Sequence, residues 1–285
     1  MDVSAILLIH CPDQPGLVAA ISNFIADNGG NILDLDQHVD DERGVFFMRV
    51  EWDLAGFRIP LPQIAERFGD AIGTPFHMQW QLHFSNERPR MAIFVSRLPH
   101  CLTDLLARWQ SGEWQVEIPL IISNHDTLRP VAEQFGIEFR VFPIDATNKA
   151  EQEERELALL HEFAIDLVVL ARYMQVLSPR LINAFDARII NIHHSFLPAF
   201  PGSRPYHSAH ARGVKIIGAT SHYVTEELDS GPIIAQDVTP ITHRDPVDAL
   251  VRKGRDLERT VLARAIWFHI QRKVLSYDNR TVVFD

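Results

Sequence analysis

The chain has 285 residues, of which 46% are hydrophobic and 22% are charged, and its formal net charge at pH 7 is -10. This length favours two modest domains, and the composition is typical of a globular protein with a packed core. The negative charge argues against binding nucleic acid by bulk electrostatics, because such binding needs clustered Lys and Arg. Cys11 and Cys101 are far apart and outside any CxxC pattern, which predicts neither a disulfide framework nor a zinc knuckle.

The N-terminus lacks the basic segment, long apolar stretch and small-residue cleavage site of a secretory signal. No apolar run is long enough to span a bilayer. Two isolated cysteines fit a reducing compartment. We therefore expect a cytoplasmic protein that binds neither a membrane nor nucleic acid.

The first 84 residues predict the element order βαββαβ. After Gly16, apolar side chains recur at a spacing of three to four residues, which is typical of an amphipathic helix, and Asn28-Gly29-Gly30 supplies its terminator. The other segments are apolar or alternating runs bounded by turn formers. The predicted elements are a strand at 4–10, a helix from Gly16 to Asn28, strands at 31–39 and 45–54 joined as a hairpin, a helix at 61–73 and a strand at 75–84.

This order, together with the stretch DQPGLVAAISNFIADNGGNI, resembles the ACT domain, a small ligand-binding module with a ferredoxin-like fold. The resemblance implies an amino-acid effector at the turn after the first strand, where backbone N–H groups could meet a ligand at a helix N-terminus. That turn consists of Asp13, Gln14, Pro15 and Gly16. The alternative is a turn that binds nothing. ACT modules tend to pair, so the resemblance also implies a homo-oligomer.

The second part of the chain alternates strand-like and helical runs, which predicts a Rossmann-like α/β domain with a mostly parallel sheet and helices on both faces. We expect the ACT-type domain at 1–85, a polar linker at 86–90 and the second domain at 91–285. The predicted strands are 91–96, 114–123, 138–143, 166–171 and 187–194, and the predicted helices are 101–109, 148–164 and 246–273. The last helix carries an apolar side and is interpreted as packing rather than chemistry.

Two stretches, NIHHSFLP from Asn191 and SHYVTEELDSGPII from Ser221, resemble the formyltransferase fold family. In that family an Asn-x-His motif and a later Asp form the catalytic trio, which implies Asn191, His193 and Asp229 here. These residue types suit the cleavage of a formyl amide. A preorganised amide donor stabilises the oxyanion by about 3 kcal/mol, and an imidazole can protonate the leaving nitrogen. A carboxylate can support the imidazolium or orient water, and the sequence leaves these two roles open.

The resemblance also implies a pocket for the folate substrate. The segment LARYMQVLSP matches the stretch that borders the pterin in this family, and the loop before Asp229 would close the other side. The implied substrate-binding residues are Met174, Gln175, Val176, Leu177, His194, His222, Thr225, Glu226, Glu227 and Leu228. On sequence grounds alone, Met174 and Leu177 could equally be core residues.

Histidines raise the possibility of a metal site. His207 and His210 have the spacing that places two imidazoles on one helix face, near the adjacent His193 and His194. A third protein ligand in a recognisable arrangement is missing, and the formyltransferase resemblance implies metal-free catalysis. We therefore expect no metal and no resident cofactor, with folate entering only as the substrate.

The fate of the formyl group depends on other features. The loop Ser96–Cys101 has no glycine, unlike the phosphate-binding turn of glycinamide ribonucleotide formyltransferases. His194 stands where transferases commonly have proline, and it could close the acceptor side to all nucleophiles but water. With the leading ACT module and the motifs NIHHSFLPAFPGSRPYH and GRDLERTVLARA, the chain resembles the formyltetrahydrofolate deformylase family nearly end to end.

That resemblance implies hydrolysis of 10-formyltetrahydrofolate to formate and tetrahydrofolate, which would supply formate and balance the one-carbon folate pool for purine synthesis. Two alternatives remain at this point. One is a formyltransferase that acts on a small amine or a sugar nucleotide, because it would use the same trio. The other is a noncatalytic amino-acid sensor.

Overall fold

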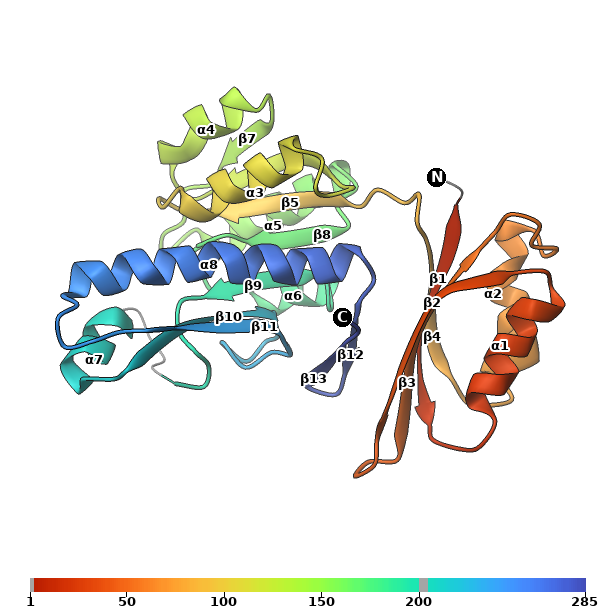
Figure 1. Ribbon diagram of the computed structural model, residues 1–285. Helices are drawn as coiled ribbons and strands as arrows, with labels where there is room; N and C mark the ends of the chain where they lie inside the picture. The colour runs from red at the N-terminus through yellow and green to blue at the C-terminus, as the bar shows by residue number, and fades with distance from the viewer. Residues whose placement is uncertain (1–2, 200–204) are drawn as a thin grey trace. The chain divides into compact units, whose positions relative to one another are not determined.

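The computed structural model describes residues 3–199 and 205–285 (Figure 1). Residues 200–204, part of the NIHHSFLPAFPGSRPYH motif, lie outside the described residues. The chain divides into two compact units. The first comprises the chain up to Glu87 with residues 272–275 and 282–285, and the second comprises residues 88–271 with 276–281.

The first unit contains an antiparallel sheet with the strand order β2-β3-β1-β4, and two helices pack on one of its faces. The elements are β1 (Ser4–Pro12), α1 (Leu17–Asp27), β2 (Asn31–Asp40), β3 (Val45–Asp53), α2 (Leu61–Phe68), the π-helical turn η1 (Gly69–Gly73) and β4 (Gln79–Phe84). Alternate residues of β1, including Leu7 and Ile9, share a core with Ile21 of α1 and Ile64 of α2. The predicted βαββαβ order is confirmed. The apolar side chains that alternate along the strands and those that recur every three to four residues along the helices pack into one core.

The fourth strand is shorter than the predicted range 75–84. Helix α2 continues as the π-helical turn η1, and the backbone N–H of Met78 donates to the carbonyl of Gly73 at 2.8 Å. His77 has a φ of 52°, a left-handed conformation that interrupts a regular strand. Residues 75–78 therefore belong to a turn, and β4 begins only at Gln79.

The second unit contains a seven-stranded sheet with the order β11-β10-β9-β8-β5-β6-β7. Strands β9, β8, β5, β6 and β7 pair in parallel, and β10 and β11 run antiparallel at one edge. The strands are β5 (Arg90–Val95), β6 (Glu117–Ser123), β7 (Glu138–Val141), β8 (Leu167–Leu170), β9 (Ile189–His193), β10 (Ile216–Tyr223) and β11 (Ile233–Pro240). The predicted mostly parallel sheet is confirmed.

Helices connect these strands and cover the sheet. They are α3 (His100–Gln110), the 3-10 turn η2 (Asp126–Leu128), α4 (Arg129–Gln134), α5 (Lys149–Glu162), α6 (Pro179–Ala184), α7 (Pro205–Arg212) and α8 (Val247–Ile270). Leu160 of α5 and Leu181 of α6 share a core with Phe94, Ile122 and Val168 of the parallel strands. On the other face, α8 lies along β9, β10 and β11 and packs against α3 (Figure 1).

The antiparallel strands β10 and β11 and a C-terminal hairpin were not predicted. Strands β10 and β11 flank the motif that contains Asp229, and β12 (Val274–Tyr277) pairs with β13 (Arg280–Val283). Their apolar runs are short, such as Ile233 to Ala235, and such runs carry little periodic signal. Within residues 3–199 and 205–285, no helix combines the length and apolar character needed to cross a membrane.

The strand order creates a switch point beside β5. From β5 the chain proceeds to β6 and β7 on one side, and then crosses to β8 and β9 on the other. Ligands of open α/β sheets bind where the carboxyl ends of strands diverge at such a point. The segments after β8 and β9, which carry most of the predicted site residues, lie there.

Candidate active site

A cavity of about 430 Å³ lies at the carboxyl ends of β8 and β9, and its size is typical of a small-molecule site. It contains all three predicted trio residues and nine of the ten predicted substrate-binding residues. The predicted residues that line it are Asn191, His193, Asp229, Met174, Gln175, Val176, Leu177, His194, His222, Thr225, Glu226 and Leu228. Glu227 does not line the cavity, and its backbone carbonyl instead accepts a hydrogen bond from the Thr225 hydroxyl at 3.2 Å.

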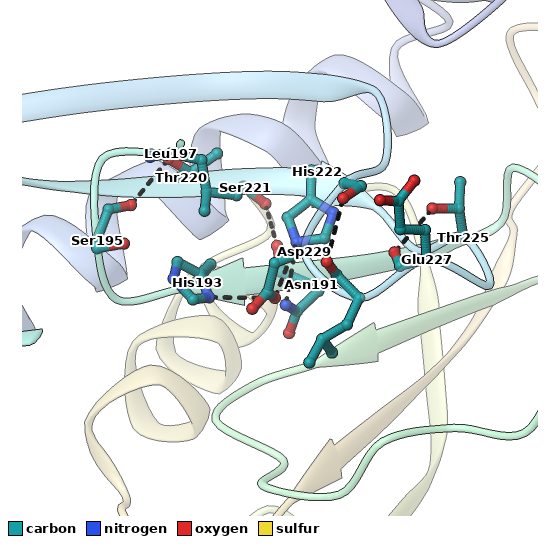
Figure 2. A network of polar contacts seen from close by, with 12 residues as sticks. Asn191, His193, Ser195, Leu197, Thr220, Ser221, His222, Thr225, Glu227 and Asp229 are labelled. Atoms are coloured by element: carbon teal, nitrogen blue, oxygen red, sulfur yellow. Dashed lines mark hydrogen bonds and ion pairs between the residues drawn. The ribbon is translucent and has the colours of Figure 1, made fainter. Parts of the chain in front are cut away.

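A hydrogen bond joins His193 and Asp229 inside this cavity. The distance between His193 Nδ1 and Asp229 Oδ1 is 3.1 Å, and the His193 side chain is only 6% exposed (Figure 2). The hydrogen bond to His193 keeps the pKa of Asp229 below its usual value, and nearby histidines add to this effect although partial burial opposes it. His193 Nε2 is buried and has no hydrogen-bond partner among the described residues. One ring nitrogen is therefore fixed by a carboxylate, and the other is available to a ligand.

Asn191 is oriented by His222 from the neighbouring antiparallel strand. His222 Nδ1 lies 2.8 Å from the carbonyl of Tyr223, and Asn191 Nδ2 lies 3.2 Å from His222 Nε2. A carbonyl can only accept, so Nδ1 carries the proton, and in the neutral ring Nε2 accepts from the Asn191 amide. Burial lowers the pKa of His222, which favours this neutral form. The Asn191 amide is thereby fixed with a second N–H free for a ligand.

The backbone that follows Asp229 passes close to the end of β10. Asp229 has a φ of 55°, in the left-handed region that Asp tolerates better than most residues. A Cβ on Gly231 would lie 1.9 Å from the carbonyl oxygen of Tyr223, so only glycine fits there. The Asp-Ser-Gly sequence thus brings the carboxylate back over the end of β9, where Figure 2 shows it beside His193 and His222.

Large apolar side chains line the cavity but remain open to solvent. Met174, Val176 and Leu228 are 52%, 54% and 64% exposed. Such exposure is unusual for neighbouring apolar side chains and is typical of a ligand-binding surface. Met174 is therefore no core residue, whereas Leu177 both lines the cavity and belongs to the core below it.

The sequence did not point to Arg172 or Tyr173, which also line the cavity. It also missed a buried polar cluster beneath it, centred on Glu258 of α8, the helix predicted to serve packing alone. Glu258 accepts hydrogen bonds from His100 Nε2 at 2.8 Å and from the Tyr206 hydroxyl at 2.7 Å. The signal available in the sequence was Glu258 itself, a charged residue that stands at helical spacing among the apolar residues of α8.

Within residues 3–199 and 205–285, ligand-type side chains for a metal come together at His100, Cys101 and Glu258, not at the histidine pairs considered from the sequence. Burial raises the pKa of the Cys101 thiol strongly, which disfavours the thiolate that binds metal. The Glu258 carboxylate already accepts two hydrogen bonds. This group is therefore accounted for as a hydrogen-bonded core cluster. His207 and His210 are both exposed on α7.

A second cavity, of about 330 Å³, lies in the first unit at the turn predicted to bind an effector. Asp13, Gln14 and Gly16 line it, whereas Pro15 does not. Gly16 has a φ of 95° and immediately precedes α1, which places the turn at a helix N-terminus. The backbone N–H of Asp13 is already bonded to the carbonyl of Gly44 at 2.8 Å.

Comparison with known proteins gives a consistent picture. The ACT domain family matches residues 5–73, and the formyl transferase family matches residues 89–266. A formyltetrahydrofolate deformylase from Synechocystis sp. is 56% identical over 99% of both chains, and one from Bacillus subtilis is 47% identical over 98% of this chain and 93% of its own.

A crystal structure of a formyltetrahydrofolate deformylase from Pseudomonas syringae superposes with a TM-score of 0.97 at 45% identity. The match covers 100% of this chain and 95% of that one. Fold, domain order and full-length identity therefore agree, and the chain belongs to the formyltetrahydrofolate deformylase family.

Proposed function

We propose that the chain hydrolyses 10-formyltetrahydrofolate to formate and tetrahydrofolate, and so adjusts the one-carbon folate pool used in purine synthesis. The observation that carries this proposal is the cluster of Asn191, His193 and Asp229 in one cavity of a chain that belongs to the deformylase family. Folate enters as the substrate, and the residues of the cavity supply the groups that the reaction needs without a resident cofactor.

The geometry suggests a role for each residue. Asn191 and His193 line the cavity, and the second N–H of the Asn191 amide and Nε2 of His193 can donate to the formyl oxygen as it becomes negative. Water attacks the formyl carbon, the new C–O bond forms, and the bond from carbon to nitrogen breaks. One water proton passes to the folate nitrogen and the other leaves, so that formate is released. Asp229 holds His193 and can orient the water.

The walls of the cavity suit the folate ring system. Met174, Val176 and Leu228 offer apolar surface, and Gln175 and Glu226 add polar groups at the edge. A bound ring would bury the apolar side chains and remove the cost of their exposure. These five residues, with Leu177, Thr225 and His222, are our proposed substrate contacts.

Water is favoured over an amine acceptor by the loop after β5. Ser96 Oγ accepts from the backbone N–H of Met174 at 3.0 Å and donates to Asn124 Oδ1 at 2.7 Å. Pro99 then precedes α3, and no glycine intervenes. Ser96 is held by these hydrogen bonds and the loop contains no glycine, so the loop offers no glycine-rich cradle for the phosphate of an acceptor.

The experiment that tests this function is formate release from 10-formyltetrahydrofolate in buffer without any amine. We expect turnover at an ordinary enzymatic rate, on the order of 1 s⁻¹ or faster. A transferase would be slow until a small amine or a sugar nucleotide was added. A noncatalytic sensor would release no formate above the uncatalysed rate, so each alternative has its own result.

We also propose that an amino acid binds the cavity of the first unit beside Asp13, Gln14 and Gly16, and that it regulates the enzyme. Screening the common amino acids by thermal shift should find one that raises the melting temperature, because a ligand of the native state stabilises it. Asp13→Ala should lose this shift, whereas Asp27→Ala, at the far end of α1 from this turn, should keep it. If no amino acid shifts the melting temperature, the proposal is contradicted.

The homo-oligomer and the cytoplasmic location stay predictions.

A further inference from the structure

Arg172 lies two residues after the end of β8, lines the main cavity and has no role in the mechanism above. Its backbone φ is 65°, a left-handed conformation that is strained for a residue with a Cβ. Residues held in such conformations cluster at functional sites. The backbone would accept glycine here without strain, so the arginine side chain needs an explanation of its own.

The guanidinium of Arg172 is buried but poorly satisfied. Its side chain is 11% exposed, and Nε lies 3.4 Å from Glu258 Oε2, at ion-pair distance but without hydrogen-bond geometry. Both Nε and Nη1 lack a hydrogen-bond partner among the described residues. Buried polar groups in native proteins are nearly always paired, so unsatisfied donors beside a cavity indicate a missing ligand or water.

Glu258 holds this guanidinium from below. It is itself fixed by Tyr206 and His100, which come from two other helices, α7 and α3. Burial works to raise the pKa of Glu258, but the hydrogen bond from His100 and the charge of Arg172 outweigh it, so the carboxyl stays ionised. The negative charge offsets the positive one, and the pair can remain buried beside the cavity that Arg172 lines.

His194 provides a second unsatisfied group in the same cavity. Its ring stacks on that of His193 with centroids 5.1 Å apart, and its Nε2 is buried without a hydrogen-bond partner among the described residues. Burial, followed by the positive charge of Arg172, lowers the pKa of His194 to about 4. The ring is therefore neutral at physiological pH. In the tautomer protonated on Nδ1, its Nε2 can accept a hydrogen bond from water.

Hydrolysis differs from formyl transfer in the number of oxygens at the reacting carbon. Transfer to an amine gives a tetrahedral intermediate with one oxygen, whereas attack by water gives two, and the product carboxylate shares its charge between them. Asn191 and His193 can serve the first oxygen. A hydrolase gains from a second set of donors for the oxygen that arrives with water.

We propose that Arg172 and His194, supported by Glu258, form a subsite for the attacking water and for the carboxylate of the product formate. This inference rests on the proposed hydrolytic function and deepens it. In the ground state, His194 Nε2 accepts from the water and orients its oxygen toward the formyl carbon. When the C–O bond has formed and the bond to nitrogen has broken, that oxygen belongs to formate and accepts from Arg172. Proton transfer to the folate nitrogen is unchanged.

The test measures inhibition by sodium formate on the full-length protein. Initial rates of tetrahydrofolate formation are recorded at rising formate, with ionic strength held constant by sodium chloride. Formate should inhibit the wild type more strongly than chloride. In Arg172→Gln we expect the formate inhibition constant to rise at least ~10-fold and kcat to fall about 100-fold, while KM for the folate changes less than ~3-fold.

A purely structural arginine gives a different result. It would lower the melting temperature and the rate of Arg172→Gln, but it would leave the formate inhibition constant at the wild-type value, and this outcome overturns the proposal. Arg108→Gln is the matched control, because Arg108 also binds two carboxylates, on α3 and the turn after it, outside the cavity. It should keep wild-type inhibition by formate.

A second variant keeps the proposal testable if Arg172→Gln does not fold. Arg172→Lys keeps the positive charge beside Glu258 but loses the forked donor geometry, so it should fold and still show weaker formate inhibition by at least ~5-fold. Unchanged inhibition in this variant overturns the proposal. Direct binding of ¹³C-formate, followed by NMR line broadening in wild type and variants, separates this inference from the proposed function, because it needs no turnover. If the wild-type protein binds formate no more tightly than it binds chloride, the proposed subsite is refuted.

Discussion

Asp229→Asn is expected to lower kcat/KM for formate release by at least ~1000-fold, a loss similar to that seen when a carboxylate that orients a catalytic histidine is made neutral. The change is isosteric, but the amide lacks the charge that pairs with His193 Nδ1 at 3.1 Å. The asparagine could also present N–H to a nitrogen that must itself donate. Single-turnover formate release with excess enzyme gives the size of the effect.

The fold should survive this substitution, since Asp229 is 21% exposed in a loop rather than part of the core. Tetrahydrofolate should therefore bind with an affinity within a few-fold of wild type. Asp237→Asn is a matched control, because Asp237 lies on β11 and pairs only with Arg264 among the ion pairs described. Retention of more than about a tenth of the wild-type rate by Asp229→Asn would remove Asp229 from the mechanism.

Asn191→Ala is expected to reduce kcat by about 100-fold to 1000-fold with a much smaller change in KM. Loss of one preorganised oxyanion donor typically has this effect, because the donor acts mainly when charge develops on the carbonyl oxygen. The amide is already oriented by His222 Nε2 at 3.2 Å, so the donor is preorganised before charge develops. Steady-state kinetics with purified protein measure both constants.

Two variants check this interpretation. Asn148→Ala removes an asparagine whose amide binds the carbonyl of Pro143 at the start of α5, outside the cavity, and should leave kcat unchanged. His222→Phe removes the partner of Asn191 and should lower kcat by a smaller factor than Asn191→Ala. If Asn191→Ala raised KM and left kcat intact, Asn191 would be a binding residue rather than an oxyanion donor.

Local sequence patterns predicted the elements of the first unit and their order. Apolar residues at helical spacing in α1 and the polar turn between β2 and β3 both reflect short-range preferences, which act within a few residues. The motif residues Asn191, His193 and Asp229 were identified by their resemblance to a known family. The same resemblance correctly indicated the deformylase family, since the motifs and domain order are features of the chain itself.

Where local preferences compete with tertiary contacts, the sequence was less informative. The predicted strand at 75–84 lost its first four residues to the turn after η1, where Gly73 packs against Trp80. Strands β10 and β11 were missed because their antiparallel pairing at the edge of the sheet depends on partners far away in the chain. Glu227 lies beside pocket residues in sequence, yet it does not line the cavity.

The sequence by itself determined the fold class, the domain order and the residue types able to cleave a formyl amide. Only the tertiary structure decided which charges meet. Arg172, His100 and Glu258 are separated by at least 72 residues along the chain, and they come together through the packing of α3 and α8 over the sheet. No local pattern encodes such a cluster, because its stability arises from burial and mutual pairing that exist only in the folded protein.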